Sequence, residues 1–423
     1  MEPQTFLVLA VGLIAFGLVS AKLSNSILTA PILFVAFGMV TGSLGLHLVD
    51  IDYSGHTIEI IAEITLLLVL YTDAARIDVR ILWRYHNLPS RMLLIGLPLT
   101  ILAGTLAAMI IFPGFPVFEA ALLAAILAPT DAALGQAVVT NKAVPVRIRQ
   151  TLNAESGLND GIALPVVLVF VSLALASEGP AQSAPEWITF GALQVTLGPL
   201  AGLAAGYAGG RLIDRASETG WMNRTFQGLG ALAVAFAAFA LAELIGGNGF
   251  IAAFVAGLTV GNVHRGICEF LFDFVEEEGQ LLTLLTFFLF GAVIVPRVID
   301  DVTFATILYA AASLTVVRIV PVILSLLGTG LNLPTWLFLG WFGPRGLASI
   351  LFALLVLGKN ESEQAAAIMA TVVMTVFLSV LLHGVTAAPA ARWYARMVSR
   401  MGDCEEARPV TEMPTRFRDT NAN

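Results

Sequence analysis

The sequence contains 423 residues, of which 57% are hydrophobic and only 12% are charged, and its formal net charge at pH 7 is −8. Water-soluble domains are about 25% charged, so the composition excludes a soluble globular protein and indicates a polytopic membrane protein. The two cysteines, Cys268 and Cys404, are far apart in the sequence and indicate neither a disulfide framework nor a metal site. No basic run indicates a nucleic-acid partner, and we expect no cofactor.

Apolar windows of spanning length recur along the whole chain. The first window is not followed by a small-residue cleavage pattern, so we expect a retained helix rather than a removed signal peptide. The thirteen predicted spans are 5–21, 27–45, 57–75, 92–112, 117–139, 150–176, 187–210, 226–246, 249–263, 279–296, 302–328, 335–358 and 364–388.

The basic residues support this count and give an orientation. If the N-terminus is outside, 18 of the 22 lysines and arginines fall in segments expected on the cytoplasmic side. The outer segments keep only Arg297 and Lys359, and the last two, Arg318 and Arg345, lie within apolar windows. Positive residues favour the cytoplasmic side, so we expect the N-terminus outside and the C-terminus in the cytoplasm of an inner or plasma membrane protein.

Two windows contain residues that interrupt helices. The fifth reads LLAAILAPTDAALGQAVV and the twelfth reads LFLGWFGPRGLASILFALL. Proline removes a helical hydrogen bond and glycine weakens a helix, so both are expected to unwind near the bilayer centre, although such residues often mark only a kink. If spans 1–6 and 8–13 form two halves, the broken spans 5 and 12 occupy the same position in each half. The offset between them is seven spans, an odd number, so the second half has the opposite orientation in the membrane. This pattern is typical of an inverted-repeat transporter with its site at the broken helices.

Five ionisable side chains are predicted at mid-membrane depth: Asp131, Glu155, Asp160, Arg318 and Arg345. Each charge there costs at least ~2.5–3.5 kcal/mol on insertion scales, so such residues indicate a functional site. Four other acids fall near the ends of spans and are expected at the membrane interface: Glu59, Glu63, Asp73 and Glu243.

The sixth window carries four polar residues on one helical face: Glu155, Ser156, Asn159 and Asp160. Ser156 and Asp160 lie one turn apart. Together with Thr130 and Asp131 at the break of the fifth window, they predict an all-oxygen cage suited to a small, hard monovalent cation.

A charge count narrows the chemistry of this cage. Three acids and two arginines leave one formal negative charge, which either a proton or a monovalent cation can neutralise. Asp160 is the natural candidate, because desolvation favours its protonated form and lets the proton compete with the cation. Glu155 is expected to pair with an arginine. Asp131 has two open roles, as a cation ligand or as compensation for exposed helix N-termini, and Arg345 is expected to compensate helix C-termini.

Other chemistries are less well supported. His383, near the cytoplasmic end of the last window, is expected to be a packing or interface residue rather than a proton relay. Asp131 and Asp160 could form the dyad of an intramembrane aspartyl protease, but a shared-proton dyad needs little cationic compensation, and two arginines are present. A membrane sensor that kept the fold and lost transport remains a further alternative.

Six stretches resemble the NhaP-like cation:proton antiporters, the prokaryotic relatives of animal sodium/proton exchangers. In chain order they read LLVLYTDAARIDVRILWR, APTDA, ESGLND, GFIAAFVAGLTVGN, GPRG and HGVTAAP, and the resemblance covers spans 1 to 13. It implies an all-α, NhaA-like fold of thirteen transmembrane helices with inverted repeats of six, in which helices 5 and 12 cross while unwound. It also implies a homodimer and elevator-like alternating access. The expected transmembrane domain is 1–388, with core helices over about 57–176 and 302–388, and the tail 389–423 is expected to be short, polar and mobile.

The resemblance also implies roles for residues. Asp160 would bind the cation and the proton in turn. Ligand or near-ligand positions are matched by Thr130, Asp131, Ser156 and Glu155. Asn159 would brace the crossing helices near Thr130 and Asp131. The motif glutamate would pair with an arginine, for which Arg318 is the better match and Arg345 the second; both arginines would support the site.

We therefore predict a secondary active transporter, not an enzyme, that exchanges Na⁺, with Li⁺ as an alternative cation, for H⁺. The Asn159–Asp160 pair resembles the branch associated with electroneutral one-for-one exchange. K⁺/H⁺ exchange in the same fold is the alternative, because ligand residue types do not separate the two cations. Many relatives read Thr-Asp-Pro where this chain reads Thr130-Asp131-Ala132, and this departure also leaves the cation selectivity open. A role in pH homeostasis and a bell-shaped pH dependence are expected.

Overall fold

The structure is a computed structural model that describes residues 3–23, 26–49, 56–80, 87–131, 134–178, 184–263, 280–357, 362–402, 404–408 and 410. Every regular element within these residues is a helix, which confirms the predicted all-α class. Cys268, Lys359, Ala132 and the tail from 411 lie outside the described residues, as does the side chain of Glu59.

Helices run through the chain in an order that follows the predicted windows. They are α1 (Pro3–Leu23), α2 (Ala30–Thr41), α3 (His56–Ala75), α5 (Asn87–Arg91), α6 (Leu97–Ile111), α7 (Val117–Ile126), α8 (Gln136–Val139), α9 (Val146–Glu178), α10 (Ala184–Glu218), α11 (Arg224–Leu244), α12 (Gly249–Val263), α14 (Val295–Val298), α15 (Phe304–Leu314), α16 (Val316–Leu326), α17 (Leu333–Trp341), α18 (Leu347–Leu357) and α19 (Glu363–Ser399). Shorter π or 3₁₀ segments are η1 (Met92–Gly96), η3 (Phe290–Ile294), η4 (Ile299–Asp301) and η5 (Glu405–Ala407).

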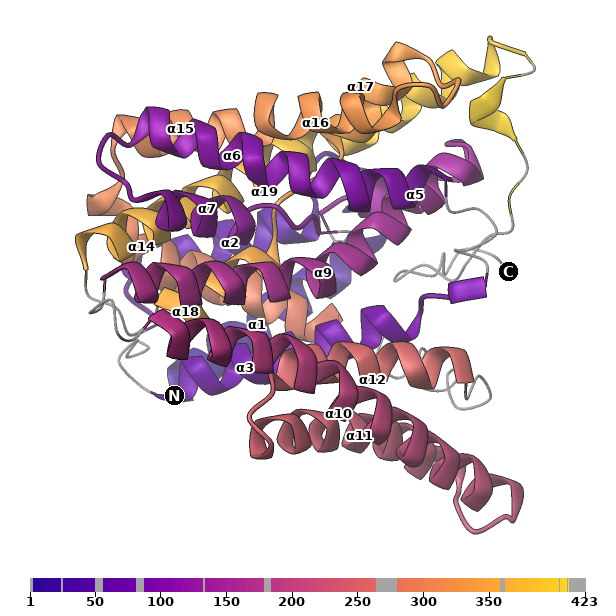
Figure 1. Ribbon diagram of the computed structural model, residues 1–423. Coiled ribbons are helices and arrows are strands. Elements are labelled where there is room, and N and C mark those ends of the chain that lie inside the picture. The colour runs from indigo at the N-terminus through magenta and orange to yellow at the C-terminus, as the bar shows by residue number, and fades with distance from the viewer. Residues whose placement is uncertain are drawn as a thin grey trace.

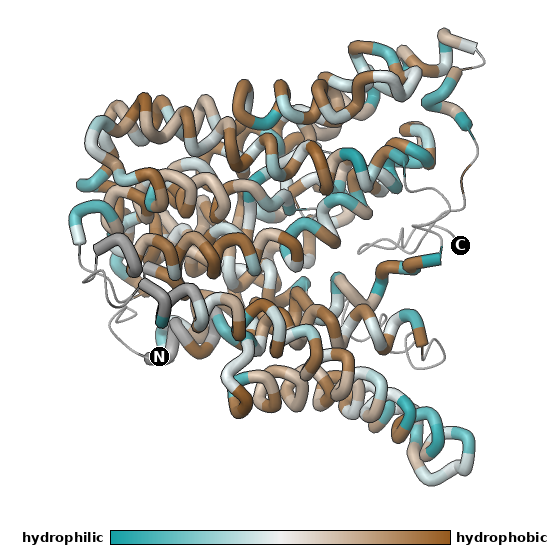
Figure 2. The backbone as a smooth tube through the Cα atoms, viewed as in Figure 1, coloured by the Kyte–Doolittle hydropathy of each residue, from teal (hydrophilic) through white to brown (hydrophobic). Residues whose placement is uncertain are grey.

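The helices have the length and polarity of membrane spans. Within the described residues, seven are long and apolar enough to cross a membrane, and four more are apolar but shorter. Figure 2 shows hydrophobic residues along the helices and hydrophilic residues gathered mainly toward their ends and connections. Glu63 and Glu243 are exposed and Asp73 is partly exposed, as expected for acids near an interface. The chain is therefore built as an integral membrane protein.

The site helices lie between two groups of helices. α10 and α11 lie along one edge, where α10 packs on α12 and α12 packs on α3 (Figure 1). The opposite edge holds α6, α15, α16 and α17, and α7, α9 and α18 lie between the two groups (Figure 1). Gly257 and Gly261 explain the GFIAAFVAGLTVGN stretch: a Cβ atom at either would overlap the backbone of α3 at Tyr71 or Ala75, so small residues let α12 approach closely.

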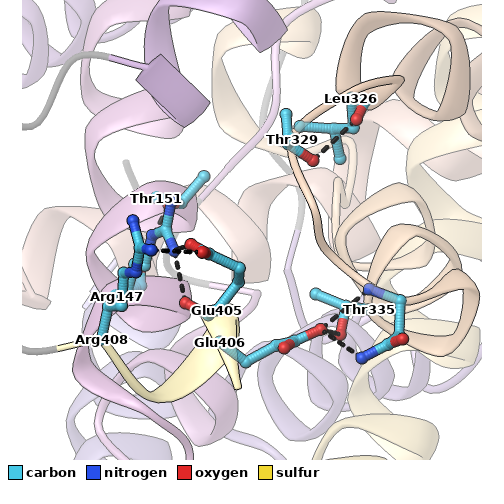
Figure 3. A network of polar contacts seen from close by, with 9 residues as sticks. Arg147, Thr151, Leu326, Thr329, Thr335, Glu405, Glu406 and Arg408 are labelled. Atoms are coloured by element: carbon cyan, nitrogen blue, oxygen red, sulfur yellow. Dashed lines mark hydrogen bonds and ion pairs between the residues drawn. The ribbon is translucent and has the colours of Figure 1, made fainter. Parts of the chain in front are cut away.

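The first part of the predicted tail, 389–423, is helical in the described residues. α19 continues to Ser399, and η5 folds back against the protein at Arg147, the second residue of α9 (Figure 3). There Arg147 Nη1 donates to Glu405 Oε2 at 2.9 Å. The Oε1 atom of the neighbouring, fully buried Glu406 accepts hydrogen bonds from Asn332 N and Thr335 Oγ1, both at 2.9 Å.

The hydrogen-bond donors to the buried Glu406 carboxylate therefore come from residues far away in the sequence (Figure 3). A buried carboxylate is tolerated where such donors satisfy it. The composition of the tail could not show this, because those donors lie some 70 residues earlier in the chain.

Candidate functional site

Both predicted interruptions are present. Regular helix ends at Ile126 in α7 and resumes at α8, and α17 ends at Trp341, before the irregular residues 342–346 and the start of α18. Helix ends leave main-chain donors and acceptors without helical partners. Here several of them are satisfied by groups from the other break. The Asp131 N–H donates to Pro344 O at 2.8 Å, which joins the two unwound segments directly.

Two charged side chains complete this crossing. Asp131 Oδ2 accepts from the Leu347 N–H at 3.0 Å, at the N-terminus of α18. Arg345 Nη1 donates to Ala128 O at 2.9 Å and Pro129 O at 3.2 Å, just beyond the C-terminal end of α7. A negative group at a helix N-terminus and a positive group at a C-terminus are both favourable. The structure thus places Asp131 and Arg345 as expected for compensating exposed helix ends.

Gly346 makes the close crossing possible. A Cβ atom at this position would overlap the carboxylate of Asp131. Glycine lacks that atom, so the backbone of the twelfth predicted span can approach the side chain from the fifth.

The sixth predicted span, α9, brings its polar face against the break of α7. Ser156 Oγ donates to Thr130 O at 2.7 Å, and Asn159 Nδ2 donates to Thr130 Oγ1 at 2.6 Å. Asp160 follows one turn beyond Ser156, and only 8% of it is exposed. Asn159 therefore bonds the break of α7 at Thr130, and the two hydrogen bonds hold Thr130 beside Ser156.

Glu155 pairs with Arg318, the first of the two arginines predicted for this role. The shortest separation, between Arg318 Nη2 and Glu155 Oε1, is 2.6 Å, and the same nitrogen donates to Oε2 at 2.8 Å. Both side chains are at least 97% buried. The window 302–328, predicted as one helix, is divided at Thr315 into α15 and α16, and Arg318 lies in the first turn of α16. Arg345 instead binds the carbonyls beyond α7.

The sequence interpretation missed what His383 does. Its ring is fully buried and Nε2 lies 2.9 Å from Trp341 O, the last residue of α17. Ser379, one turn earlier, accepts from the Arg345 N–H at 2.7 Å. The expectation of a packing residue was therefore incomplete. The available signal was a Ser and a His four residues apart within an apolar helix.

The fold and the buried charges define a class of protein. Apolar helices enclose three acids and two arginines where two interrupted helices cross, and this arrangement is that of a membrane-embedded ion transporter rather than an enzyme. Within that class, the chain belongs to the sodium/hydrogen exchanger family: the family described as "Sodium/hydrogen exchanger, transmembrane" matches residues 5–393.

Individual relatives agree with this assignment. The chain is 27% identical over 417 residues to the K⁺/H⁺ antiporter NhaP of Alkalimonas amylolytica, covering 97% of this chain and 70% of that protein. It is 26% identical over 347 residues to a Na⁺/H⁺ antiporter of Saccharomyces cerevisiae, covering 77% of this chain but only 35% of the yeast protein. The chain therefore spans about a third of the length of that relative.

A solved structure shares the fold. The sodium proton antiporter MjNhaP1 from Methanocaldococcus jannaschii, determined at pH 8, superimposes with a TM-score of 0.75 at 20% identity. The match covers 92% of this chain and 97% of that one.

Proposed function

We propose that this chain exchanges Na⁺ for H⁺ across a membrane, with the two ions competing for Asp160. The observation that carries the proposal is the buried group of charges at the crossing. The group contains three acids and two arginines, so it has one formal negative charge in excess. The acids are Asp131, Glu155 and Asp160, and the arginines are Arg318 and Arg345. One monovalent cation or one proton neutralises it, but not both, which is the requirement for one-for-one electroneutral exchange.

Oxygen atoms suited to a cation surround the same place. Ser156 directs its hydroxyl hydrogen at Thr130 O, so the lone pairs of its oxygen remain for a ligand. With Asp160 one turn away and Asp131 in the adjoining break, the proposed ligands are all oxygen, as small, hard cations prefer. Glu155, held by Arg318, serves as a fixed neighbour and Asn159 as a brace.

K⁺/H⁺ exchange is the second candidate. It is favoured by the relative named a K⁺/H⁺ antiporter, which matches nearly the whole chain. The ligand types do not separate the two ions, because the size of an oxygen cage depends on backbone geometry.

The architecture that we infer around this site has thirteen spans in the inner or plasma membrane, with the N-terminus outside and the C-terminus cytoplasmic. Helices are present in each predicted window, including the pair of interrupted helices that an inverted repeat requires. We further infer a core of residues 57–176 and 302–388 that moves in an elevator-like manner against the remaining helices, which form the contact of a homodimer. A role in pH homeostasis follows from exchange of protons for cations.

Purified protein in liposomes with a pH-sensitive dye tests the function. Wild type should dequench the dye when Na⁺ is added, and Li⁺ and K⁺ added in turn give the selectivity. Asp160→Asn keeps the side-chain shape, so it should lower the response at least 100-fold and leave the Tm unchanged. The matched control is Glu63→Gln, at an exposed acid on α3, which should behave as wild type. Silence toward all three cations refutes exchange, and exchange by Asp160→Asn above one hundredth of the wild-type response refutes the competition at that residue.

A further inference from the structure

Two polar residues on the last long helix face the break between α17 and α18. Ser379 and His383 are four residues apart on α19, so they project from one face. Both are fully buried. α19 itself is continuous over 37 residues and packs against α18. It therefore provides a rigid support beside a segment that is not helical.

Each of these residues holds one end of the break. His383 Nε2 lies 2.9 Å from Trp341 O, where α17 ends. Arg345 N, two residues before α18 begins, donates to Ser379 Oγ at 2.7 Å. These are main-chain groups that a continuous helix would satisfy internally. Trp341 O also accepts from the Gly343 N–H at 2.9 Å, so α19 supplies a second partner at this end and the acceptor for the Arg345 N–H at the other.

The two residues are also linked to each other. His383 Nδ1 lies 3.1 Å from Ser379 Oγ and 3.0 Å from Ser379 O. With its hydrogen on Nε2, the ring donates to Trp341 O and Nδ1 accepts from the Ser379 hydroxyl; with the hydrogen on Nδ1, the ring donates to Ser379, whose carbonyl oxygen also only accepts. In both tautomers the Ser379 hydroxyl oxygen accepts from the Arg345 N–H. The Nε2 tautomer gives one chain of hydrogen bonds from the end of α17 to the segment that starts α18.

The same segment is bound on its other side by the ion site. Pro344 O accepts from the Asp131 N–H, and Gly346 lies against the Asp131 carboxylate. Since residues 342–346 lack regular helical structure, bonds from α19 and from Asp131 set their position. A shift of this segment would move both Arg345 and Asp131.

We propose that Ser379 and His383 are positioning residues for ion exchange: together they hold the unwound segment 342–346 so that Asp131 and Arg345 stay in place at the site. This inference rests on the proposed function. It assigns the HGVTAAP stretch a task beyond packing, although neither side chain touches the transported ion.

The test compares variants that remove the bonds with variants that restore them. Ser379→Ala and His383→Leu should raise the cation concentration for half-maximal exchange about tenfold, equivalent to one hydrogen bond of about 1.4 kcal/mol. Ser379→Thr and His383→Gln keep a hydroxyl and a side-chain N–H donor and should recover most of the affinity. The matched control is Ser325→Ala, at an equally buried serine whose hydroxyl bonds Val322 O within its own helix. It should lower Tm without changing the half-maximal concentration.

Hydrogen exchange of the backbone amides of Gly343 and of residues 345–347 gives a second readout that needs no transport. Ser379→Ala should speed this exchange at least tenfold, and Ser325→Ala should not. If wild type transports cations but Ser379→Ala and His383→Leu match the control in half-maximal concentration, and Ser379→Ala matches it in amide exchange, the positioning role is wrong while the proposed function stands. If wild type transports no cation, the proposed function fails, and the role of Ser379 and His383 in ion transport fails with it. In that case unchanged hydrogen exchange of the amides in Ser379→Ala would also show that Ser379 does not hold the segment in place.

Discussion

Removing one member of the Glu155–Arg318 pair should destabilise the protein strongly. The two side chains are 2.6 Å apart and at most 3% exposed, so Arg318→Met leaves a buried carboxylate without its guanidinium. Breaking such a pair costs about 3–5 kcal/mol. With an unfolding entropy of about 2.1 cal/mol/K per residue over 423 residues, thermal unfolding in detergent should shift down by about 3–6 °C. Glu155→Gln should have a similar effect.

The double variant Glu155→Gln/Arg318→Met separates the ion pair from lost packing. Its loss in free energy of unfolding should be smaller than the sum of the two single losses by at least about 2 kcal/mol, because the double variant leaves no lone buried charge. Arg408→Met is the control: Arg408 and Glu405 are also 2.6 Å apart, but Arg408 is 66% exposed, and an exposed pair contributes about 0–1 kcal/mol. Additive single effects, or single effects no larger than the control, would refute the reasoning.

Two further predictions concern the tail and the crossing. Burial raises the pKa of Glu406, but hydrogen bonds led by that from the Asn332 N–H outweigh it and hold the pKa below its ordinary value of 4.5. Its stabilisation is therefore present above that pH and lost as the pH falls through the lowered pKa. The Tm of Glu406→Ala should therefore lie below that of wild type at pH 7, and the gap should narrow as the pH falls below 4.5. A gap independent of pH contradicts this. Gly346→Ala should abolish exchange, because the new methyl group overlaps Asp131. The control Gly17→Ala has open space at its Cβ position and should transport normally. Normal transport by both variants would show that the crossing tolerates the methyl group.

The sequence was informative where a single residue type carries its own physical penalty. Charge in an apolar window is expensive wherever it occurs, so Asp131, Glu155, Asp160, Arg318 and Arg345 could be selected before any coordinates were known. All five are at least 92% buried in the structure. Proline and glycine disrupt helices locally, and for that reason both interruptions were located correctly.

Contacts between distant segments were decided only by the tertiary structure. The resemblance ranked Arg318 above Arg345 as the partner of Glu155, but the charges and their spacing alone did not separate the two arginines, because each lies in a different span from Glu155. The structure shows the pair with Arg318. His383 looked like a packing residue because its partner is a main-chain carbonyl some forty positions away.

The same holds for Glu406, a charged residue in a polar tail that becomes buried through donors near Asn332. Helix formation and membrane insertion depend on residues within a turn or a window of each other, and a sequence displays these directly. Hydrogen bonds that satisfy broken helices and buried charges depend on how whole helices are placed, and that placement exists only once the chain has folded.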